Sequence, residues 1–499
     1  MIRRAFWVVL GLVLLLAAVV AGNTLRHGSR QLDVPPAPPL AMDEKGVAEK
    51  LAGAIRFRTV SSNDDAQLNA QEFQKLHAYL QQRFPRVHAT LKREVIGGLS
   101  LLYTWQGTDA KAAPIMLMAH QDVVPIAPGT EATWSADPFA GELKEGFVWG
   151  RGAWDDKGNL IAQLEAMEML VASGFTPRQT IYLAAGADEE VGGMRGASEI
   201  AKLLQSRGVR LDFVIDEGLL ITEGIMPGLN KPAALVGIAE KGYLSVAMKV
   251  PATPGHSSMP PPAGQSAIGM MSAALRRLDD EQLPAAIRGV AREMFETVAP
   301  EMSGFGRVAL SNLWLFGPLV QSQLEKSAST NAMIRTTTAL TIVNAGNKDN
   351  VIPGLAEATV NFRLLPGDTR ETVMQHVRSK VANERFELTS LPFSSEPSPI
   401  SPTRSASYEL INRTVRALFP GTIVAPGLMV GATDSRYFAA ISDHIYRFSP
   451  VRAKPQDLAR FHGTNERIST SNLAELVRFY NQLLRNAAAA PATTSPPSP

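Results

Sequence analysis

The stretch Ile115–Asp122, IMLMAHQD, joins a short apolar run to polar residues at its end. The apolar part, Ile115–Met118, predicts a buried β-strand that ends at His120. In an open α/β sheet, ligands bind just outside the carboxyl ends of the strands. The stretch therefore predicts one strand of such a sheet, with His120 and Asp122 at the edge where a ligand binds.

Strand and helix patterns alternate in the sequence that follows. Apolar residues recur at helical spacing over Asn159–Ser173. An apolar strand follows at Thr180–Ala185, and after a second helix another strand lies at Leu211–Ile215. Strands separated by helices of about 10–15 residues indicate βαβ units. We therefore expect an α/β fold with a mostly parallel sheet.

The pattern changes near Lys241. Gly242–Val250 and Ala356–Leu364 alternate between apolar and polar residues, as strands do in an antiparallel sheet with one face in water. After Pro366 the alternation of strands and helices returns. We predict a catalytic α/β domain in two parts, residues 42–239 and 366–486, interrupted by an inserted α+β lid or dimerisation domain, residues 240–365.

The composition excludes several classes of protein. Of the 499 residues, 45% are hydrophobic and 19% are charged, which suits two or more folded domains and excludes extensive disorder. The formal net charge is only +2, so we expect no nucleic-acid partner. The chain has no cysteine, which excludes disulfides and thiolate ligands. Any bound metal must be held by carboxylates and by some of the 8 histidines.

The N-terminus has the pattern of an export signal. Arg3 and Arg4 precede an uncharged, largely apolar run over Ala5–Gly22. The run is just long enough to cross a bilayer, and Val19–Ala21 offers a candidate cleavage site. We favour an uncleaved signal anchor in residues 1–22 over a cleaved signal peptide. In both cases the bulk of the chain lies on the exported side of the cytoplasmic membrane, and cleavage would make it secreted or periplasmic.

Two further segments lack the apolar residues of a core. Residues 23–41 are polar and then rich in proline, which is typical of a stiff linker between a membrane and a domain. Residues 487–499 are almost all Ala, Pro, Ser and Thr, and we expect this tail to be disordered.

Four segments place polar residues where strands are predicted to end. Together they contain a histidine and at least five carboxylates, which would repel one another and take up protons unless cations lay among them. Histidine with Asp and Glu suits zinc or a related divalent ion. Two adjacent ions that share a carboxylate fit this number of ligands, with a bound water as nucleophile. The segments are His120–Asp122, Asp155–Asp156, Asp188–Glu190 and Asp216–Glu217.

In the order of its motifs, the sequence resembles the zinc-dependent metallopeptidase family M20, which includes carboxypeptidase S, aminoacylase and related N-acyl-amino-acid hydrolases. The resemblance covers residues 45–485 and fits the carboxypeptidase S branch best. The matching motifs are AHQDVVP (119–125), WSADPFAGEL (134–143), GRGAWDDKG (150–158), DEEVGG (188–193), DEG (216–218), GHSSMPP (255–261), NVIPG (350–354), GATDSRYF (431–438) and FHGTNERI (461–468).

The resemblance implies a site for two Zn²⁺ ions, with Co²⁺ or Mn²⁺ as alternatives. Asp155 bridges the two ions, and the family has a cis peptide bond after this aspartate. The fourth segment supplies one ligand, for which Asp216 is slightly favoured over Glu217. The implied metal ligands are His120, Asp155, Glu190, His462 and either Asp216 or Glu217.

The resemblance also implies catalytic roles. Glu189 is the general base that takes a proton from water and delivers it to the leaving nitrogen. Asp122 orients the ring of His120. His256, in the inserted domain, donates a hydrogen bond to the oxyanion. In many relatives this histidine reaches the site of a neighbouring subunit. We therefore consider a homodimer that forms through the lid.

The free carboxylate of a substrate needs a cation with a forked geometry. Arg436 and Arg363 are the candidates, with Asn331 and Asn350 as amide partners, and a structural ion pair is the alternative role for each arginine. We predict a metallo-carboxypeptidase that cleaves a peptide or N-acyl bond next to a C-terminal amino acid. An aminoacylase or N-fatty-acyl-amino-acid hydrolase is the alternative, and an inactive binding module on the same fold is a distant one.

Overall fold

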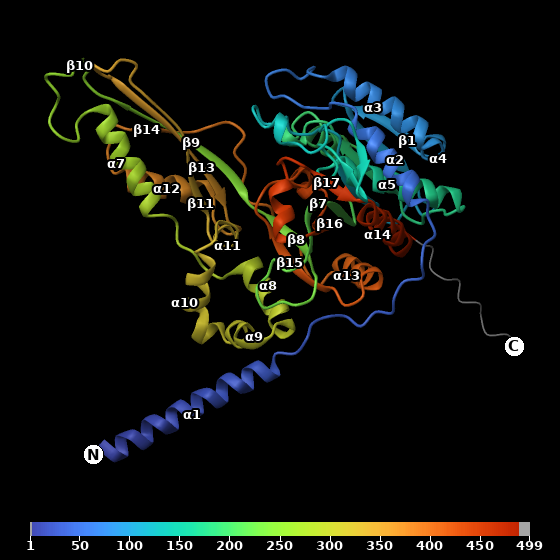
Figure 1. Cartoon of the computed structure of the whole chain (residues 1–499), viewed down its shortest axis with the longest axis horizontal. Coiled ribbons are helices and arrows are strands. Elements are labelled where there is room, and N and C mark those ends of the chain that lie inside the picture. Colours follow the sequence, from blue (N-terminus) through green and yellow to red (C-terminus); the bar gives the residue numbers. More distant parts are fainter. Residues whose placement is uncertain (1, 489–499) are drawn as a thin grey trace.

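A computed structural model describes residues 2–488 and shows a catalytic body, a second unit beside it and an N-terminal helix that projects from them (Figure 1). The body is built on a sheet of eight strands in the order β1-β2-β6-β3-β7-β16-β8-β15. These strands are β1 (Lys92–Ile96), β2 (Ser100–Trp105), β3 (Ile115–His120), β6 (Ile181–Gly186), β7 (Phe213–Thr222), β8 (Ala233–Glu240), β15 (Ile423–Met429) and β16 (Ile445–Ala453).

The strands at the centre of this sheet are parallel. β3 pairs in parallel with β6 and β7, β7 with β16, and β8 with β15. Antiparallel pairs join β1 to β2, β2 to β6, β16 to β8 and β7 to β8. Every residue of β3 is buried, because helices cover both faces of the sheet, and this accounts for the uninterrupted apolar run. The predicted α/β fold with a mostly parallel sheet is confirmed.

Two layers of helices enclose the sheet. The larger group packs on one face, and α6 with the short 3₁₀ helix η4 packs on the other. The helix predicted over 159–173 is α5. The larger group is α2 (Glu44–Ile55), α3 (Ala70–Arg83), α4 (Pro85–Thr90), α5 (Lys157–Ala172), α13 (Ala406–Leu418) and α14 (Thr470–Ala488); the opposite face carries α6 (Ala197–Ser206) and η4 (Asp434–Ala440).

The register of the strands brings the predicted polar segments to one edge. His120, the last residue of β3, lies opposite Gly186, the last residue of β6. Leu117 of β3 lies opposite Ile215 of β7, so residues 216–217 are level with the end of β3. The carboxyl ends of three neighbouring parallel strands thus form one ligand-binding edge.

A three-stranded sheet next to this edge joins two distant parts of the chain. It pairs β5 (Phe147–Trp149) with β4 (Glu142–Lys144) and with β17 (Arg467–Ser469). The loop after β5 carries Asp155, and the segment before β17 carries His462. The pairing of β5 with β17 holds these two segments side by side.

The second unit contains an antiparallel sheet in the order β11-β13-β9-β14, with α7 and α12 sharing its core. β14 pairs with the free edge of β9, so the unit continues through Ser390 and does not end at residue 365 as expected. We therefore propose a lid that begins at Gly242 and includes β14. Its elements are β9 (Gly242–Pro251), β10 (Gly255–His256), α7 (Ala267–Asp280), β11 (Thr337–Ala345), β12 (Val351–Ile352), β13 (Leu355–Leu364), α12 (Arg370–Val381) and β14 (Glu387–Ser390).

The helical segment between α7 and β11 packs partly on the catalytic body. In α8 (Gly289–Val298), Met294 and Phe295 share a core with Ile423 and Ala425 of β15. We therefore propose that α8, part of the stretch expected to form the lid, belongs to the body. The short helices that follow are α9 (Gly304–Ser311), α10 (Leu313–Leu324) and α11 (Ala328–Ile334).

Helix α1 (Ile2–Arg26) has no buried residue and is long and apolar enough to cross a membrane. It extends past residue 22, where the linker was expected to begin. The linker then runs along the catalytic body instead of standing free. Gln31 Nε2 donates to the carbonyl of Val424 at 3.0 Å, and Ala37 N donates to the carbonyl of Ala417 at 2.8 Å.

The C-terminal helix α14 continues through Ala488, whose side chain is buried. The tail expected to be disordered from residue 487 thus begins as helix. The rest of that segment, residues 489–499, lies outside the described residues.

Candidate metal centre

The carboxylate of Asp155 lies between two imidazoles. Asp155 Oδ1 is 2.8 Å from His120 Nε2, and Asp155 Oδ2 is 2.8 Å from His462 Nε2. The peptide bond Asp155–Asp156 is cis, as the resemblance implied. Tertiary structure thus gives one carboxylate two histidine partners, one from the end of β3 and one from the segment before β17. A ligand that bridges two metal ions needs this arrangement.

Acidic side chains surround the two histidines. Glu190 Oε2 is 3.3 Å from His462 Nε2, and Glu217 Oε1 is 3.9 Å from His120 Nε2. In three overlapping groups, one nitrogen or oxygen atom of each side chain lies within 4.8 Å of the others, as the ligands of one small cation do. The groups are His120 with Asp155 and Glu190, His120 with Glu189 and Glu217, and Asp155 with Asp156 and Glu217.

The structure brings Glu217, and not Asp216, into these groups. Asp216 Oδ2 accepts the N–H of Ser435 at 2.9 Å, and its Oδ1 accepts the N–H of Glu217 at 2.9 Å. The carboxylate of Asp216 is therefore engaged by backbone donors. Because successive residues of a strand point to opposite faces, only one of the two turns toward His120. The geometry favours Glu217, whereas the sequence slightly favoured Asp216.

The cluster holds more negative than positive charge. Burial is the largest cause that raises the pKa of Glu189 and of Glu217 well above the usual carboxyl range, and neighbouring carboxylates raise it further. Hydrogen bonds to Asp155 and Glu190 raise the pKa of His462 to about 10. Crowded, buried carboxylates remain ionised when a cation lies among them. Imidazole and carboxylate donors, without thiolates, fit zinc or a similar divalent ion.

Asp122 connects His120 to the turn that carries both glutamates. Asp122 Oδ1 is 3.4 Å from His120 Nδ1 and accepts the N–H of Glu189 at 3.2 Å. Asp122 Oδ2 accepts the N–H of Glu190 at 3.1 Å and the hydroxyl of Ser61 at 2.6 Å. His120 Nδ1 itself is hydrogen-bonded to the backbone carbonyl of Asp122 at 3.0 Å. These contacts fit the orienting role implied for Asp122, whose main chain and carboxylate both face the ring of His120.

Glu466, to which the sequence assigned no role, is fully buried beside the site. Its Oε1 accepts the backbone N–H groups of Gly152, Trp154 and Asp155 at 2.9, 2.9 and 3.1 Å. It therefore shapes the loop that presents Asp155. The sequence did contain a signal for Glu466. In the motif FHGTNERI this acid follows His462 by four positions, in a segment otherwise poor in acids.

Asp434 is a second residue that the sequence did not single out. It is 3% exposed, and among the described residues neither of its carboxylate oxygens has a hydrogen-bond partner. Gly193 leaves room for it, because a Cβ there would lie 1.9 Å from Asp434 Oδ1. Burial raises the pKa of Asp434 well above the usual range. The motif GATDSR contains Asp434, but Arg436 was the residue of this motif that the sequence offered as a cation for the substrate carboxylate.

The two predicted substrate-binding arginines come from different units, Arg436 from the body and Arg363 from the lid. Arg436 Nη2 donates to the carbonyl of Gly192 at 2.8 Å, in the turn that follows the acidic segment. Arg363, from β13 of the lid, stacks its guanidinium on the ring of Tyr243 at 4.7 Å. Burial and then the charge of Arg436 lower the pKa of Arg363. Asn331, on α11, has a buried side-chain oxygen without a hydrogen-bond partner among the described residues.

His256 and Asn350 lie elsewhere, at the outer end of the lid. β10, which contains His256, pairs with β12 in a short ribbon away from the catalytic body (Figure 1). The ring of His256 is exposed, and its Nδ1 is 2.8 Å from Ser258 Oγ. Asn350 precedes β12 and is also exposed. Within the described chain, no hydrogen bond or ion pair joins either residue to the metal-ligand groups.

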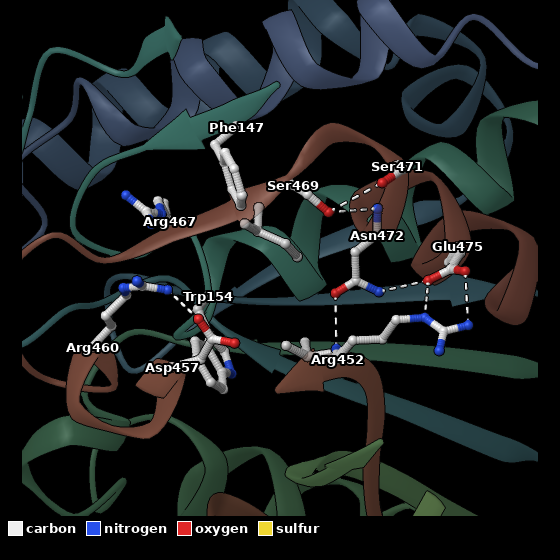
Figure 2. Close-up of a pocket in the computed structure, with 12 residues that line it drawn as sticks. Phe147, Trp154, Arg452, Asp457, Arg460, Arg467, Ser469, Ser471, Asn472 and Glu475 are labelled. Carbon is white, nitrogen blue, oxygen red and sulfur yellow. Dashed lines mark hydrogen bonds and ion pairs between the residues drawn. The ribbon is translucent and has the colours of Figure 1, made fainter. Parts of the chain in front are cut away.

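A cavity of about 160 Å³ adjoins Trp154 and β17. Figure 2 shows its polar wall, where Arg452 Nε is 2.8 Å from Glu475 Oε2 and Asn472 bonds to both residues. None of the candidate metal ligands lines this cavity. Arg467 stacks on the rings of Phe147 and Trp149, and the other charges that line the cavity are paired with one another, so we assign the cavity no part in the reaction.

Comparison with known proteins supports the sequence resemblance. Residues 116–486 match the model of peptidase family M20/M25/M40, and this span contains every candidate metal ligand. N-fatty-acyl-amino acid synthase/hydrolase PM20D1 of Xenopus tropicalis is 44% identical over 448 residues, which cover 89% of this chain and 86% of that protein. Probable carboxypeptidase S-like 2 of Dictyostelium discoideum is 39% identical over 474 residues, which cover 93% and 90%.

Solved structures share the fold at much lower identity. The M20 family metallo-carboxypeptidase Sso-CP2 of Sulfolobus solfataricus has a TM-score of 0.64 and 16% identity, over 89% of this chain and 99% of that chain. Human carnosine dipeptidase 1 has a TM-score of 0.63 and 16% identity, over 91% and 100%. YXEP of Bacillus subtilis, described as a dinuclear metal binding peptidase, has a TM-score of 0.52 and 12% identity, over 88% and 98%.

Proposed function

Because the chain belongs to peptidase family M20/M25/M40, we propose that it is a di-zinc hydrolase that cleaves a peptide or N-acyl amide bond next to a C-terminal amino acid. The observation that carries this proposal is the position of Asp155. Each of its two oxygens is 2.8 Å from a different histidine, His120 or His462. A carboxylate with two such partners supports a pair of adjacent metal ions.

The donor set divides into two halves around Asp155. His120 and Glu217 would hold one ion, and His462 and Glu190 would hold the other. Zinc suits these donors best, and Co²⁺ or Mn²⁺ would be accepted by the same ligands. When bound, the ions supply Lewis-acid polarisation of the amide carbonyl and of the attacking water.

The remaining steps belong to side chains of this chain. Glu189, whose backbone N–H is held by Asp122, takes the proton of the attacking water and delivers it to the leaving nitrogen. Arg436 and Arg363 bind the free carboxylate of the substrate, one from the body and one from the lid. Asn331, on α11, would offer its side-chain amide to the substrate.

His256 donates to the oxyanion from a second copy of the chain. Its own lid carries it to the outer end of the molecule, so a homodimer through the lids is the arrangement that would supply it. Asn350 lies beside the same β10–β12 ribbon, so it would enter the site of the second copy together with His256.

The PM20D1 relatives favour a second candidate within the same chemistry, hydrolysis of N-fatty-acyl amino acids. A substrate panel separates the two. The zinc-loaded full chain in detergent would be assayed for release of free amino acid from dipeptides and from N-acyl amino acids that range from acetyl to oleoyl. Preference for dipeptides supports the carboxypeptidase, and preference for long acyl chains supports the acylase.

Matched substrates with an amidated C-terminus test the carboxylate site. We expect them to be cleaved far more slowly, because they offer no anion to Arg436 and Arg363. If no substrate of either class is cleaved while the protein holds its metal, the proposed hydrolase function is wrong.

We also propose that α1 stays attached as a signal anchor and that the catalytic body lies on the exported side of the cytoplasmic membrane. Arg3 and Arg4 at its start favour a cytoplasmic N-terminus. At about 1.5 Å per residue its 25 residues span about 37 Å, enough for a hydrocarbon core of about 30 Å.

A further inference from the structure

The helices α9 and α10 expose an apolar surface that residues 2–488, the part described by the structure, leave uncovered. No residue of α10 is buried, although most of its residues are apolar. Between Met302 and Leu324 the only charged residue is Arg307. The uncovered side chains are Phe305 at 59% exposed, Trp314 at 59%, Leu315 at 37% and Leu319 at 47%. We call these four residues the α9–α10 apolar face.

This face lies at the end of the molecule from which α1 projects (Figure 1). The loop between α9 and α10 is bonded to the last turns of α1. Asn312 Nδ2 donates to Thr24 Oγ1 at 3.0 Å and to the carbonyl of Val20 at 3.3 Å. His27 Nδ1, just after α1, is 3.2 Å from Ser311 Oγ. The linker contacts at Gln31 and Ala37 add further links between this end of α1 and the body.

The orientation of α1 across a membrane decides on which side of the bilayer this contact lies. With Arg3 and Arg4 on the cytoplasmic side, Val20 and Thr24 lie near the exported surface. Residues bonded to them are therefore level with the outer headgroup region. Trp, Phe and Leu are the side chains that enter this region most readily, and an indole can keep its N–H hydrogen-bonded there. Trp314 Nε1 already donates to Asn312 Oδ1 at 3.3 Å.

We propose that the α9–α10 apolar face docks on the outer leaflet of the bilayer that α1 crosses, so that the catalytic body rests on the membrane surface instead of hanging from a flexible tether. This inference rests on the proposed anchor and goes beyond the hydrolase function. The face carries almost no charge, so its affinity for the bilayer is hydrophobic and does not depend on anionic lipid or salt.

The absence of cysteine allows a direct test with single labels. The full chain with one introduced cysteine is labelled with the fluorophore NBD and reconstituted in phosphatidylcholine vesicles. The test sites are Leu315→Cys and Leu319→Cys. Val95→Cys, 48% exposed on β1 of the central sheet, is the matched aqueous control, and Leu12→Cys reports on α1 itself. Each variant must retain its metal content.

We expect labels at 315 and 319 to be quenched by lipids with a nitroxide near the headgroup and protected from aqueous iodide. The label at 95 should show the reverse, and neither result should change with salt. If the labels at 315 and 319 are quenched by iodide as strongly as the label at 95 while the label at 12 is quenched by lipid, the docking proposal is wrong and the anchor stands. If the label at 12 is also aqueous, the anchor itself has failed, and with it the docking proposal.

A second copy of the chain is the competing occupant. It would protect the labels from iodide without lipid quenching, and the labels would quench one another until unlabelled protein was added. That outcome would replace the membrane with a protein interface and overturn the proposal.

Discussion

Arg151 and Glu466 form a buried ion pair, with Arg151 Nη1 2.6 Å from Glu466 Oε2. Arg151 Nη2 also donates to the carbonyls of His462 and Gly463 at 3.1 and 3.2 Å. Glu466 in turn holds the N–H of Asp155. One ion pair thus links the loop of the bridging carboxylate to the segment of a ligand histidine, although the two are far apart in sequence.

Glu466→Gln should therefore weaken metal binding without removing a ligand. The amide still accepts a backbone N–H, but the charge of Arg151 is left buried without its partner, which typically costs about 3–5 kcal/mol. Loss of such supporting residues usually lowers metal affinity or activity by about 10–100-fold. Metal content after dialysis and turnover at saturating zinc measure the two effects.

Glu475→Gln is the matched control, since Glu475 pairs with Arg452 in the neighbouring cavity and does not contact the metal loop. It should leave metal content unchanged. Equal loss of metal in both variants would show that Glu466 acts only through general stability.

The choice between two adjacent acids can be tested by counting metal ions. Glu217→Gln should lower the bound zinc by one of the two ions, because its oxygen faces His120. Asp216→Asn should keep both ions, since its carboxylate bonds to backbone N–H groups. The reverse pattern would return the ligand role to Asp216.

Glu189→Gln should keep both metal ions and lower turnover by roughly two to four decades, the usual weight of a general base. An amide at this position cannot take the proton of the attacking water. Metal analysis and steady-state kinetics on the best substrate of the panel are sufficient. Turnover close to that of the unaltered enzyme would remove Glu189 from the mechanism.

His256→Ala should retain the metal ions and lower turnover by about 100–1,000-fold, the typical cost of one oxyanion donor. Substrate affinity should change much less, because the charge appears only in the transition state. If the donor comes from a second copy, mixing His256→Ala with Glu189→Gln should restore activity in mixed dimers, where one site has both groups. No recovery after proven subunit exchange would contradict a donor in trans.

Lys241, at the junction between β8 and the lid, should make stability depend on pH. Its Nζ donates to the carbonyls of Arg335 and Ala332 at 2.8 and 3.0 Å, and burial lowers its pKa to about 7. An unfolded lysine has a pKa of about 10.4, so between these values the unfolded chain binds more protons. The free energy of unfolding should therefore rise with pH from about 7 to 10, by at most about 1.4 kcal/mol per pH unit.

Burial also lowers the pKa of Lys157 to about 7, so Lys241→Met should remove only about half of the rise, as measured by denaturant unfolding at pH 7 and pH 9. Lys249→Met, at a half-exposed position of β9, should leave it in place. An unchanged pH dependence in Lys241→Met would show that another group titrates.

The sequence alone determined the fold class and named most of the candidate site residues, because these depend on local patterns. An apolar run that ends in His120 must be a strand with a polar end, and the same holds for Asp188–Glu190 and Asp216–Glu217. Parallel strands bring such ends to one edge without further information. The ordered motifs then identified the family, which the comparisons confirmed.

Tertiary structure decided what depends on direction and on distant partners. The sequence slightly favoured Asp216 over its neighbour Glu217 as a ligand, but the alternation of side chains along β7 turns Glu217 toward His120. Glu466 and Arg151 meet only because β17 pairs with β5. The lid takes in β14 because that strand completes the edge of β9. By composition the apolar residues of α10 fit a core as well as a surface, and only the fold shows that none of them is buried.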